Sequence, residues 1–330
     1  MPRKIILDVD TGSDDAIAII LAALSDELEI LGICAVNGNR PLSETTRNTL
    51  MIVELLKMQD KIPVIKGASA PIAKTLLRGR LMNVQAVDRF YDENGKEITY
   101  HPAKFDLPEP VTKLSDTNFI TWYIDTILSS PEPVTLVAVG PLTDLGLLFR
   151  VEPKVLDNIE EIVIMGGGHN QVNTTSAAEF NIHADPEAAE IVLQSGAKIT
   201  MVPLDATHAA STYLSEVQQY RDLHTSIGDM VADLIEMRTN AYNRLQPLWA
   251  KDLCPVHDAL AVAYLLDPNV LRNVLYTRVD VDFSGGYADG CTIVDTRKKH
   301  NLPDNCYFAL DADRDLFNKI LYERVARFKD

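Results

Sequence analysis

Four aspartates lie within eight residues near the start of the chain: Asp8, Asp10, Asp14 and Asp15. Carboxylates this close together resist ionising at the same time unless a cation neutralises them. Their hard oxygen atoms favour Ca²⁺ or Mg²⁺ over zinc or copper. A solvated acidic turn with a capping aspartate is the alternative explanation of the segment. The spacing indicates a metal site, and other parts of the sequence favour it over the simple turn.

A buried strand and an apolar helix are predicted to position these carboxylates. The run Ile5–Leu7 is typical of a buried strand, and Ala16–Leu24 is typical of an apolar helix. Gly12 supplies the sharp turn between them, and either Ser13 or Asp14 can cap the helix. Open α/β sheets bind ligands at the carboxyl ends of their strands, so we expect the aspartates to converge in such a crevice.

Charge and hydropathy limit the partners of the chain. The formal net charge of −16 argues against binding to a nucleic-acid backbone or to an anionic membrane surface. It is compatible with a neutral or cationic small molecule, or with a metal. No apolar stretch reaches the roughly 20 residues needed to cross a bilayer. Asp8 and Asp10 interrupt the apolar start, so no secretory signal is expected.

Cysteine usage indicates the redox setting. The four cysteines form no Cys-x-x-Cys pair and lie far apart, at Cys34, Cys254, Cys291 and Cys306. We therefore expect free, buried thiols and a reduced cytoplasmic location.

Strand-like and helix-like segments alternate through most of the sequence. This alternation predicts an α/β fold with an open, mostly parallel sheet flanked by helices, and an added helical region near 211–250. Neither an internal repeat nor a linker divides the chain, so we expect a single domain over residues 1–330. The expected strands are 5–7, 28–36, 62–67, 134–140, 161–168 and 199–203, and the expected helices are 16–24, 43–58, 116–129, 142–149, 185–194 and 257–266.

One long segment, residues 75–113, interrupts the alternation and is rich in Gly, Pro, Asn, Tyr and charge. A connection of this length in a compact domain is usually a lid, a binding loop or disorder. The part from Leu76 to Pro110 carries Phe90, Tyr91, Tyr100 and His101. Its length and aromatic content suggest a lid over a ligand.

Polar groups with no evident structural need follow several other expected strands. Asn37 is explained as a turn residue, whereas Asn39 is not, because the intervening glycine already supplies flexibility. Met165 is followed by three glycines, which suggests backbone pressed against a ligand. Glu179 and Asn181 lie two residues apart on an expected extended stretch, so they face one side as paired groups for binding hydroxyls.

Two further motifs begin expected helices. Asp185 precedes a proline at the first helical position, so we expect it to be a structural N-cap. His257 and Asp258 stand at the head of an apolar helix, where an N-cap with a neighbouring histidine would explain them. A histidine and a carboxylate in this position can equally be a proton donor and a metal ligand. Both explanations stay open on these residues alone.

Together, these motifs resemble one family, the inosine–uridine-preferring nucleoside hydrolases. The segment Asp8–Ala16 resembles the N-terminal signature of the family. The other segments that resemble the family, in the same order and at similar spacing, are Asn37–Asn39, Met165–Gly168, Glu179–Asn181 with Asp185–Ala189, Pro255–Asp258 and Gly290–Asp295. The resemblance covers most of the chain, from Lys4 to about Phe317, and the aspartate turn combined with the His–Asp pair is highly specific.

The resemblance implies a Rossmann-like nucleoside hydrolase fold and hydrolysis of the N-glycosidic bond of ribonucleosides to free base and ribose. It implies one Ca²⁺ bound by the carboxylates of Asp10, Asp15 and Asp258 and by the backbone carbonyl of Val139. Asp10 would be the general base for a calcium-bound water, and His257 would assist departure of the base as an acid. An oxocarbenium-like transition state agrees with this acidic site.

The same resemblance implies the contacts to the sugar. Asp14, Asn39 and Asn181 would serve the 2′ and 3′ hydroxyls. Met165 would line the ribose, and Asn173 with Glu179 would bind the 5′-hydroxyl. The full expected substrate-binding set is Asp14, Asn39, Met165, Asn173, Glu179, Asn181 and Asp258. We also expect a cytoplasmic homodimer or homotetramer that acts in nucleoside salvage, with no nucleic-acid or membrane partner.

The chain departs from the family pattern in one segment. Typical members carry a glycine-rich loop containing His-Gly soon after the equivalent of Gly67–Pro71, whereas this chain has Leu76–Pro110 without that pattern. The region before the His–Asp motif supplies only candidates for base contacts, namely Tyr242, Arg244 and Trp249. No base preference is therefore predicted.

Two other functions compete with hydrolysis. The run Ile5–Thr11 imitates the Asp-x-Asp-x-Thr start of haloacid-dehalogenase-type phosphatases, in which Asp8 would be a nucleophile and Mg²⁺ the cofactor. That function leaves Glu179–Asn181 and the His–Asp motif without a role. A non-catalytic nucleoside or ribose sensor would keep the pocket but lose the base or the acid, whereas Asp10 and His257 are both present. The hydrolase is favoured.

Overall fold

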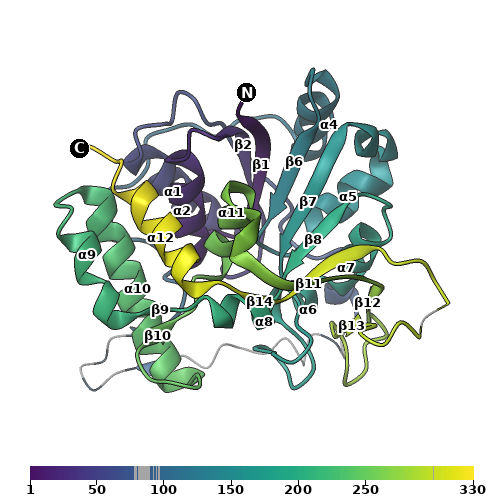
Figure 1. Cartoon of the computed structure of the whole chain (residues 1–330). Helices are drawn as coiled ribbons and strands as arrows, with labels where there is room; N and C mark the ends of the chain where they lie inside the picture. The colour runs from purple at the N-terminus through teal and green to yellow at the C-terminus, as the bar shows by residue number, and fades with distance from the viewer. Residues whose placement is uncertain (78–79, 81–89, 92, 94, 96, 300) are drawn as a thin grey trace.

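A central sheet of eight strands has the order β11-β14-β8-β7-β6-β1-β2-β3 (Figure 1). The computed structural model describes residues 1–330 except 78–79, 81–89, 92, 94, 96 and 300. The strands of this sheet are β1 (Arg3–Val9), β2 (Leu28–Ala35), β3 (Val64–Lys66), β6 (Val134–Ala138), β7 (Ile159–Met165), β8 (Ile199–Val202), β11 (Leu271–Thr277) and β14 (Cys306–Ala312). Only the β11–β14 pair is antiparallel. The predicted open, mostly parallel sheet is confirmed.

Helices cover both faces of the sheet (Figure 1). One side carries α1 (Ser13–Ala23), α2 (Leu42–Leu55), α10 (Ser226–Leu245), α11 (His257–Leu266) and α12 (Arg314–Val325), and the other carries α4 (Phe119–Ser129), α5 (Thr143–Val151) and α7 (Pro186–Leu193). Successive side chains of β1 alternate between the two cores, because side chains of a strand point to opposite faces. Ile5, Leu7 and Val9 join one core and Ile6 joins the other.

Shorter elements connect this framework. They are β4 (Phe90–Tyr91), β5 (Glu97–Ile98), β9 (Thr212–Tyr213), β10 (Leu253–Cys254), β12 (Val279–Val281), β13 (Thr292–Val294), α6 (Phe180–Ala184), α8 (Leu204–Ala209), α9 (Gln218–Arg221) and the 3₁₀ turns η1 (Lys74–Leu76), η2 (Pro153–Asn158), η3 (Leu214–Glu216) and η4 (Pro268–Val270). The added helical region near 211–250 is therefore present as η3, α9 and α10. It begins with β9, which pairs with β10, so this start was not predicted.

Several strands end earlier than the sequence predicts. The apolar run 134–140 forms strand only to Ala138, and the run 161–168 forms strand only to Met165. The residues beyond these ends leave the sheet at its carboxyl edge. Val139, the first residue after β6, lines the cavity described below, as does Met165 at the end of β7.

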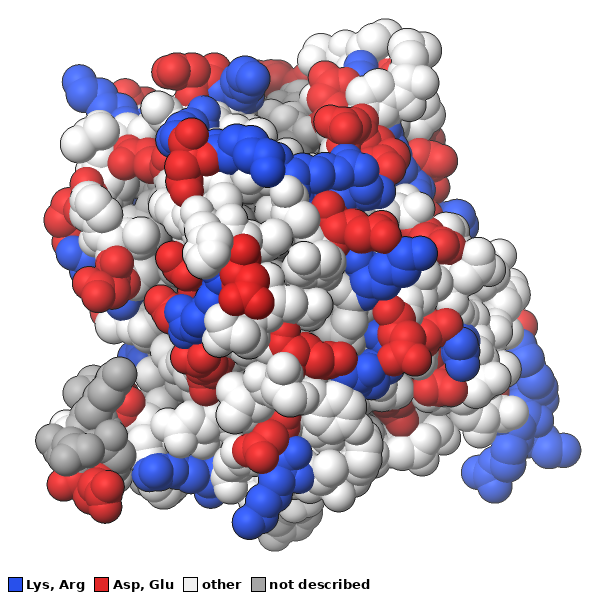
Figure 2. Space-filling model, turned by 60° about the vertical axis from the view of Figure 1, so that its left-hand side comes forward, with Lys and Arg blue, Asp and Glu red and all other residues white. Residues whose placement is uncertain are grey.

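The surface carries charges of both signs. Figure 2 shows one face on which Lys and Arg side chains are interspersed with Asp and Glu. Within the described ranges, no helix is long and apolar enough to span a membrane. All four cysteines are free, as predicted, and Cys291 is the one that is partly exposed.

Candidate active site

The turn between β1 and α1 holds three carboxylates in place. Asp15 Oδ1 accepts a hydrogen bond from the backbone N–H of Asp10 at 3.0 Å, and Oδ2 accepts one from Gly12 at 2.9 Å. Gly12 occupies the N-cap position of α1, so the expectation that Ser13 or Asp14 caps the helix was wrong. The carboxylate at the third helical position reaches back to the free amides instead.

Asp10 is fully buried at the end of β1. Its Oδ2 accepts a hydrogen bond from the backbone N–H of Asn39 at 2.5 Å. Its Oδ1 has no hydrogen-bond partner among the described residues. Burial, followed by the charge of Asp15, raises the pKa of Asp10 well above its usual value. A buried carboxylate oxygen without a partner is costly, so this atom indicates a place where a cation or substrate completes the site.

Asp258, in the first turn of α11, is a further buried carboxylate near the aspartate turn. Burial raises its pKa well above the usual value, and the charges of Asp14, Asp15 and Asp10 raise it further. The backbone of Val139 lines the same cavity. Four buried carboxylates with a nearby carbonyl form an oxygen-rich donor set that suits a hard divalent cation. The residues present therefore fit the predicted metal.

His101 brings a nitrogen atom close to this turn. Single ligand atoms of Asp14, Asp15 and His101 all lie within 4.8 Å of one another. The imidazole Nδ1 accepts a hydrogen bond from the backbone N–H of Ser13 at 3.4 Å and lies 3.6 Å from Asp14 Oδ1. The ring packs on Gly12, where a Cβ atom would overlap it. Part of the predicted lid thus contacts the aspartate turn directly.

Glu179 occupies the N-cap position of α6. Its carboxylate accepts hydrogen bonds from the backbone N–H groups of Gly167, Asn181 and Ile182 at 2.8, 2.9 and 3.1 Å. Burial, which these bonds offset in part, raises its pKa to about 7. Glu179 and Asn181 face one cavity as predicted, but they begin a helix rather than lying on an extended stretch. The three N–H donors show that Glu179 also has a structural role.

The neighbouring wall contains the other predicted ribose contacts. Asn181 Nδ2 donates to the carbonyl oxygens of Val139 and Met165 at 2.8 and 3.1 Å. Asn173 Oδ1 accepts from the backbone N–H of Phe180 at 2.9 Å. Asn173, Met165 and Asn181 all line the cavity. Because the side-chain nitrogen Nδ2 of Asn181 donates to backbone carbonyls, its side-chain oxygen Oδ1 is left available to a ligand.

The three glycines after Met165 meet protein rather than ligand. Gly167 has a φ of +75°, which favours glycine, and a side chain there would contact Thr292. A side chain at Gly168 would overlap the carbonyl of Gln171. None of the three glycines lines the cavity, and the crowding at Gly167 and Gly168 comes from the chain itself, which explains these glycines without a ligand.

Asp185 is structural, as the sequence predicts. It caps α7 by accepting from the backbone N–H of Ala188 at 3.1 Å. Its Oδ2 accepts from Thr143 Oγ1 at 2.7 Å and from the backbone N–H of Ile72 at 2.8 Å. These bonds leave it joined to three segments of the chain.

His257 stands at the start of α11 with both ring nitrogens hydrogen-bonded. Nδ1 lies 2.7 Å from Thr207 Oγ1, and Nε2 lies 2.6 Å from the hydroxyl of Tyr242. Burial, followed by the charge of Arg238, lowers the pKa of His257 well below its usual value. The imidazole is therefore neutral near pH 7 and contacts a phenol at the cavity wall.

Sequence reasoning missed Arg238 and was only partly right about the base contacts. Arg238 is 1% exposed and lines the cavity together with Tyr242. Arg244 and Trp249 do not line it, and Trp249 is 73% exposed. Arg238 lies on the apolar stripe of α10, one turn before Tyr242, and a charge on such a stripe is the signal that could have identified it.

All these elements enclose one cavity of about 220 Å³. Its lining residues are Asp14, Asn39, Tyr100, His101, Val139, Met165, Asn173, Thr174, Glu179, Phe180, Asn181, Arg238, Tyr242, Gln246, His257 and Asp258. Every predicted site residue is in this set except Asp10 and Asp15, which are joined to it through hydrogen bonds from Asn39. The sequence-predicted residues are therefore brought together.

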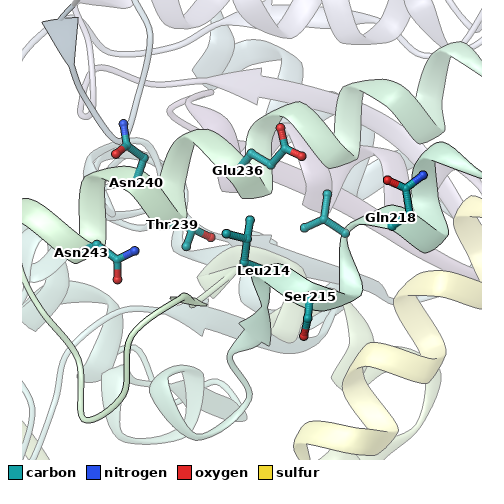
Figure 3. Close-up of a pocket in the computed structure, with 8 residues that line it drawn as sticks. Leu214, Ser215, Gln218, Glu236, Thr239, Asn240 and Asn243 are labelled. Atoms are coloured by element: carbon teal, nitrogen blue, oxygen red, sulfur yellow. The ribbon is translucent and has the colours of Figure 1, made fainter. Parts of the chain in front are cut away.

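A second hollow lies on the outer side of α10 (Figure 3) and has a volume of about 470 Å³. It is lined by Leu214, Ser215, Val217, Gln218, Glu236, Thr239, Asn240 and Asn243. Glu236 is its one charged lining residue, and it pairs with Arg221 at 2.7 Å. Since no titratable groups converge among the residues that line it, the carboxylate cavity is the candidate active site.

Comparison with known proteins gives a consistent result. Residues 5–319 match the family model described as "Inosine-uridine preferring nucleoside hydrolase". The chain is 37% identical over 325 residues to the pyrimidine-specific ribonucleoside hydrolase RihA of Salmonella arizonae, covering 98% of this chain and 99% of that protein. It is 35% identical over 333 residues to the inosine–uridine preferring nucleoside hydrolase of Leishmania major, covering 100% and 99%.

Solved structures agree with these sequence matches. A purine-preferring ribonucleoside hydrolase from Gardnerella vaginalis superposes with a TM-score of 0.84 at 30% identity, covering 98% of each chain. A plant nucleoside hydrolase superposes with a TM-score of 0.83 at 25% identity, covering 99% of each chain. The base preferences given in the names of these relatives differ from one another.

Proposed function

Since this chain belongs to the inosine–uridine preferring nucleoside hydrolase family and is an enzyme that hydrolyses ribonucleosides, we propose that its buried carboxylates activate the attacking water and stabilise the ribosyl cation. The observation that carries this proposal is Oδ1 of Asp10, a buried carboxylate oxygen without a partner in the described part of the chain. Cleavage of a glycosidic bond passes through an oxocarbenium-like state, which a group of negative charges stabilises.

Asp10 is the general base in this proposal. Oδ2 is held by the backbone N–H of Asn39, so the carboxylate is fixed and Oδ1 points to no protein donor that the structure describes. That oxygen can accept the proton of the water that attacks the anomeric carbon. General bases of this kind typically contribute ~10²–10⁴-fold to a rate.

We also propose that the site binds a calcium ion. Asp10, Asp15 and Asp258 would hold Ca²⁺ through carboxylates and Val139 through its carbonyl, since calcium accepts several oxygen ligands in flexible geometry. The repulsion among the buried carboxylates supports a cation here. When bound, the ion would neutralise these charges and lower the pKa of the attacking water. The nearby imidazole of His101 makes direct metal analysis necessary.

The ribose would bind between the carboxylates and α6. Asp14, Asn39 and Asn181, which all line the cavity, would contact the 2′ and 3′ hydroxyls. Asn173 and Glu179, which also line it, would bind the 5′-hydroxyl. Asp258 would contact both the sugar and the cation, and Met165 would pack against the ring. Polar contacts of this type fix orientation and hold the anomeric carbon near Asp10.

The leaving base would be assisted through Tyr242. If Nε2 of His257 carries the proton and Thr207 donates to Nδ1, the Tyr242 oxygen accepts from the imidazole and its own hydroxyl proton is free for the base. This arrangement agrees with the two observed distances and with a neutral His257. His257 is then an acid that acts by hydrogen bonding through a phenol.

The competing functions are disfavoured by geometry. Asp8, the nucleophile of a haloacid-dehalogenase-type phosphatase, does not line the cavity. Its side chain accepts a hydrogen bond from Tyr123 at 2.5 Å on the opposite face of the sheet. A non-catalytic sensor does not need the fixed, unpartnered oxygen of Asp10.

Organisation and location remain to be measured. We propose a single domain over residues 1–330, supported by a sheet in which β14, near the end of the chain, pairs beside β8. One cooperative unfolding transition would support it, and two separate transitions would contradict it. Free thiols support a cytoplasmic location in salvage. The homodimer or homotetramer stays a prediction that sedimentation analysis can check.

A direct test is the release of free ribose from a panel of ribonucleosides with different bases. We expect ribose from at least one purine or pyrimidine ribonucleoside, and the panel gives the base preference that the sequence does not predict. Release of phosphate from phosphomonoesters, with no ribose from any ribonucleoside, would contradict the proposal.

A further inference from the structure

Arg238 is a buried cation that forms an ion pair with Asp14, one of four buried carboxylates at the candidate active site. Asp10, Asp14, Asp15 and Asp258 are all buried, and Arg238 is the one permanently charged base among the described residues that line the cavity. Burial opposes its charge, but Asp14 and other neighbours outweigh burial and raise the pKa of Arg238 above its usual value. The guanidinium is therefore charged at every pH at which the protein is folded.

Arg238 joins three segments that meet at the cavity. Its Nη1 donates to Ser13 Oγ at 2.9 Å, in the first turn of α1. Its Nε and Nη2 both donate to the carbonyl of Pro255, at 3.1 and 2.9 Å, just before α11. Arginine donors form a rigid planar fork, so these bonds fix where the guanidinium lies relative to the aspartate turn.

The contact with Asp14 is close but is not a hydrogen bond. Nη1 of Arg238 lies 2.8 Å from Asp14 Oδ1, yet Oδ1 has no hydrogen-bond partner among the described residues. The ion pair therefore holds this carboxylate, and Oδ1 can still accept a hydrogen bond from a further donor because a carboxylate oxygen has two lone pairs. Oδ1 is buried, belongs to a cavity-lining side chain, and lacks a donor. Because buried acceptors are rarely left unsatisfied, a donor from the ligand is the expected partner.

We propose that Arg238 is a positioning residue that holds Asp14 as the acceptor for the 2′-hydroxyl of the sugar, and so makes the site discriminate ribosides from 2′-deoxyribosides. This inference rests on the proposed function, which places the sugar beside Asp14. A site built to accept a hydroxyl rejects the analogue that lacks it, because its polar group is then left unpaired.

Binding of two probes to the calcium-loaded enzyme tests the inference. The probes are an iminoribitol, a cyclic amine that mimics the ribosyl cation, and its 2-deoxy counterpart. Both carry the same charge, so the ratio of their dissociation constants cancels any general change in the potential of the cavity. Isothermal titration calorimetry gives the ratio for the wild type, for Arg238→Met and Arg238→Lys, and for the control Asn240→Ala. Asn240 is exposed, lies on the same helix, and faces the outer hollow (Figure 3).

We expect the wild type and Asn240→Ala to prefer the iminoribitol by about 10–100-fold, the range for a hydrogen bond to a charged group. Arg238→Met should reduce this ratio to within about threefold, and Arg238→Lys should give an intermediate ratio because one ammonium cannot span all three segments. If Arg238→Met fails to fold, the lysine variant alone decides. An unchanged ratio in the folded variant, or no preference in the wild type, would overturn the inference. Failure of the proposed function can be distinguished from failure of this inference, because in the first case no ribonucleoside would yield ribose.

Discussion

The hydroxyl of Tyr242 lies 2.6 Å from Nε2 of His257, and both side chains line the cavity. The two side chains come from different helices, α10 and α11, and Thr207 on α8 fixes the other ring nitrogen at 2.7 Å. This relationship makes a histidine at a helix start part of a hydrogen-bonded chain that ends at the cavity wall.

The first prediction separates assistance to the base from chemistry at the sugar. His257→Ala and Tyr242→Phe should each slow an ordinary purine or pyrimidine nucleoside by ~10²–10⁴-fold, the usual worth of a general acid. Both should cleave nitrophenyl riboside nearly as fast as the wild type, because its activated leaving group departs without help. Steady-state kcat/KM for both substrates is the measurement. Equal slowing of both substrates would mean that the pair is structural or positions the ribose.

Tyr100→Phe should separate binding from stability. Tyr100 lines the cavity, and its buried hydroxyl has no hydrogen-bond partner in the described residues. Its ring packs edge-on against Tyr242, with 4.9 Å between the ring centroids. Removing an unpaired buried hydroxyl should leave the Tm unchanged or higher. If the hydroxyl contacts the base, kcat/KM for nucleosides should fall by about 5–20-fold, corresponding to a hydrogen bond of ~1–1.5 kcal/mol. A lower Tm with unchanged kcat/KM would show that the hydroxyl supports the fold instead.

His101 predicts a pH dependence of stability. Burial lowers its pKa to about 4, despite the nearby charge of Asp14. An unfolded histidine titrates near its usual value of ~6.5, so between these values the unfolded chain binds a proton that the folded chain does not. Above about pH 6.5, His101 therefore has no effect on the free energy of unfolding. As the pH falls from about 6.5 towards 4, protonation of His101 in the unfolded chain lowers that free energy.

The measurement is the free energy of unfolding as a function of pH. The wild type should lose about 1–2 kcal/mol more than His101→Asn between pH 7 and 4, less than a full shift implies because the side chain is 22% exposed. Parallel curves for the two proteins would show that His101 is solvated and does not titrate abnormally.

Metal analysis addresses the cation. The purified protein should contain roughly one calcium per chain, as expected from three converging carboxylates and a carbonyl. Exhaustive chelation should abolish ribose release, and added Ca²⁺ should restore it. Zinc in place of calcium, or full activity after chelation, would contradict the assignment and direct attention to the imidazole of His101.

Much of the fold and site could be predicted because the signals are local. The aspartate turn, Glu179 with Asn181, and His257 with Asp258 each follow a recognisable strand or precede an apolar helix, and parallel strands bring their carboxyl ends to one edge. Asp185 was also predicted correctly, since an aspartate before proline at a helix start is explained by capping alone.

The remaining features depend on tertiary contacts that have no local signal. Gly167 and Gly168 are crowded by Thr292 and by Gln171, and nothing in the glycine run itself indicates these contacts. Arg238 stands on the buried stripe of α10, which marks it as unusual, but only its contact with Asp14 indicates its role. The apolar runs of β6 and β7 continue past the strand ends because the residues that follow are buried, Val139 at the cavity and the glycines after Met165 against other parts of the chain. At these positions, the sequence pattern predicts that a residue is buried but does not predict which residues it contacts.

The central claim is that Asp10 activates the attacking water, and Asp10→Asn tests it most directly. The substitution keeps the size of the side chain and removes the carboxylate that the base and the cation site both need. Ribose release should be abolished for every substrate, including nitrophenyl riboside, with the overall fold retained by circular dichroism. Retention of nitrophenyl riboside hydrolysis within about tenfold of the wild type, well inside the usual contribution of a general base, would contradict the account.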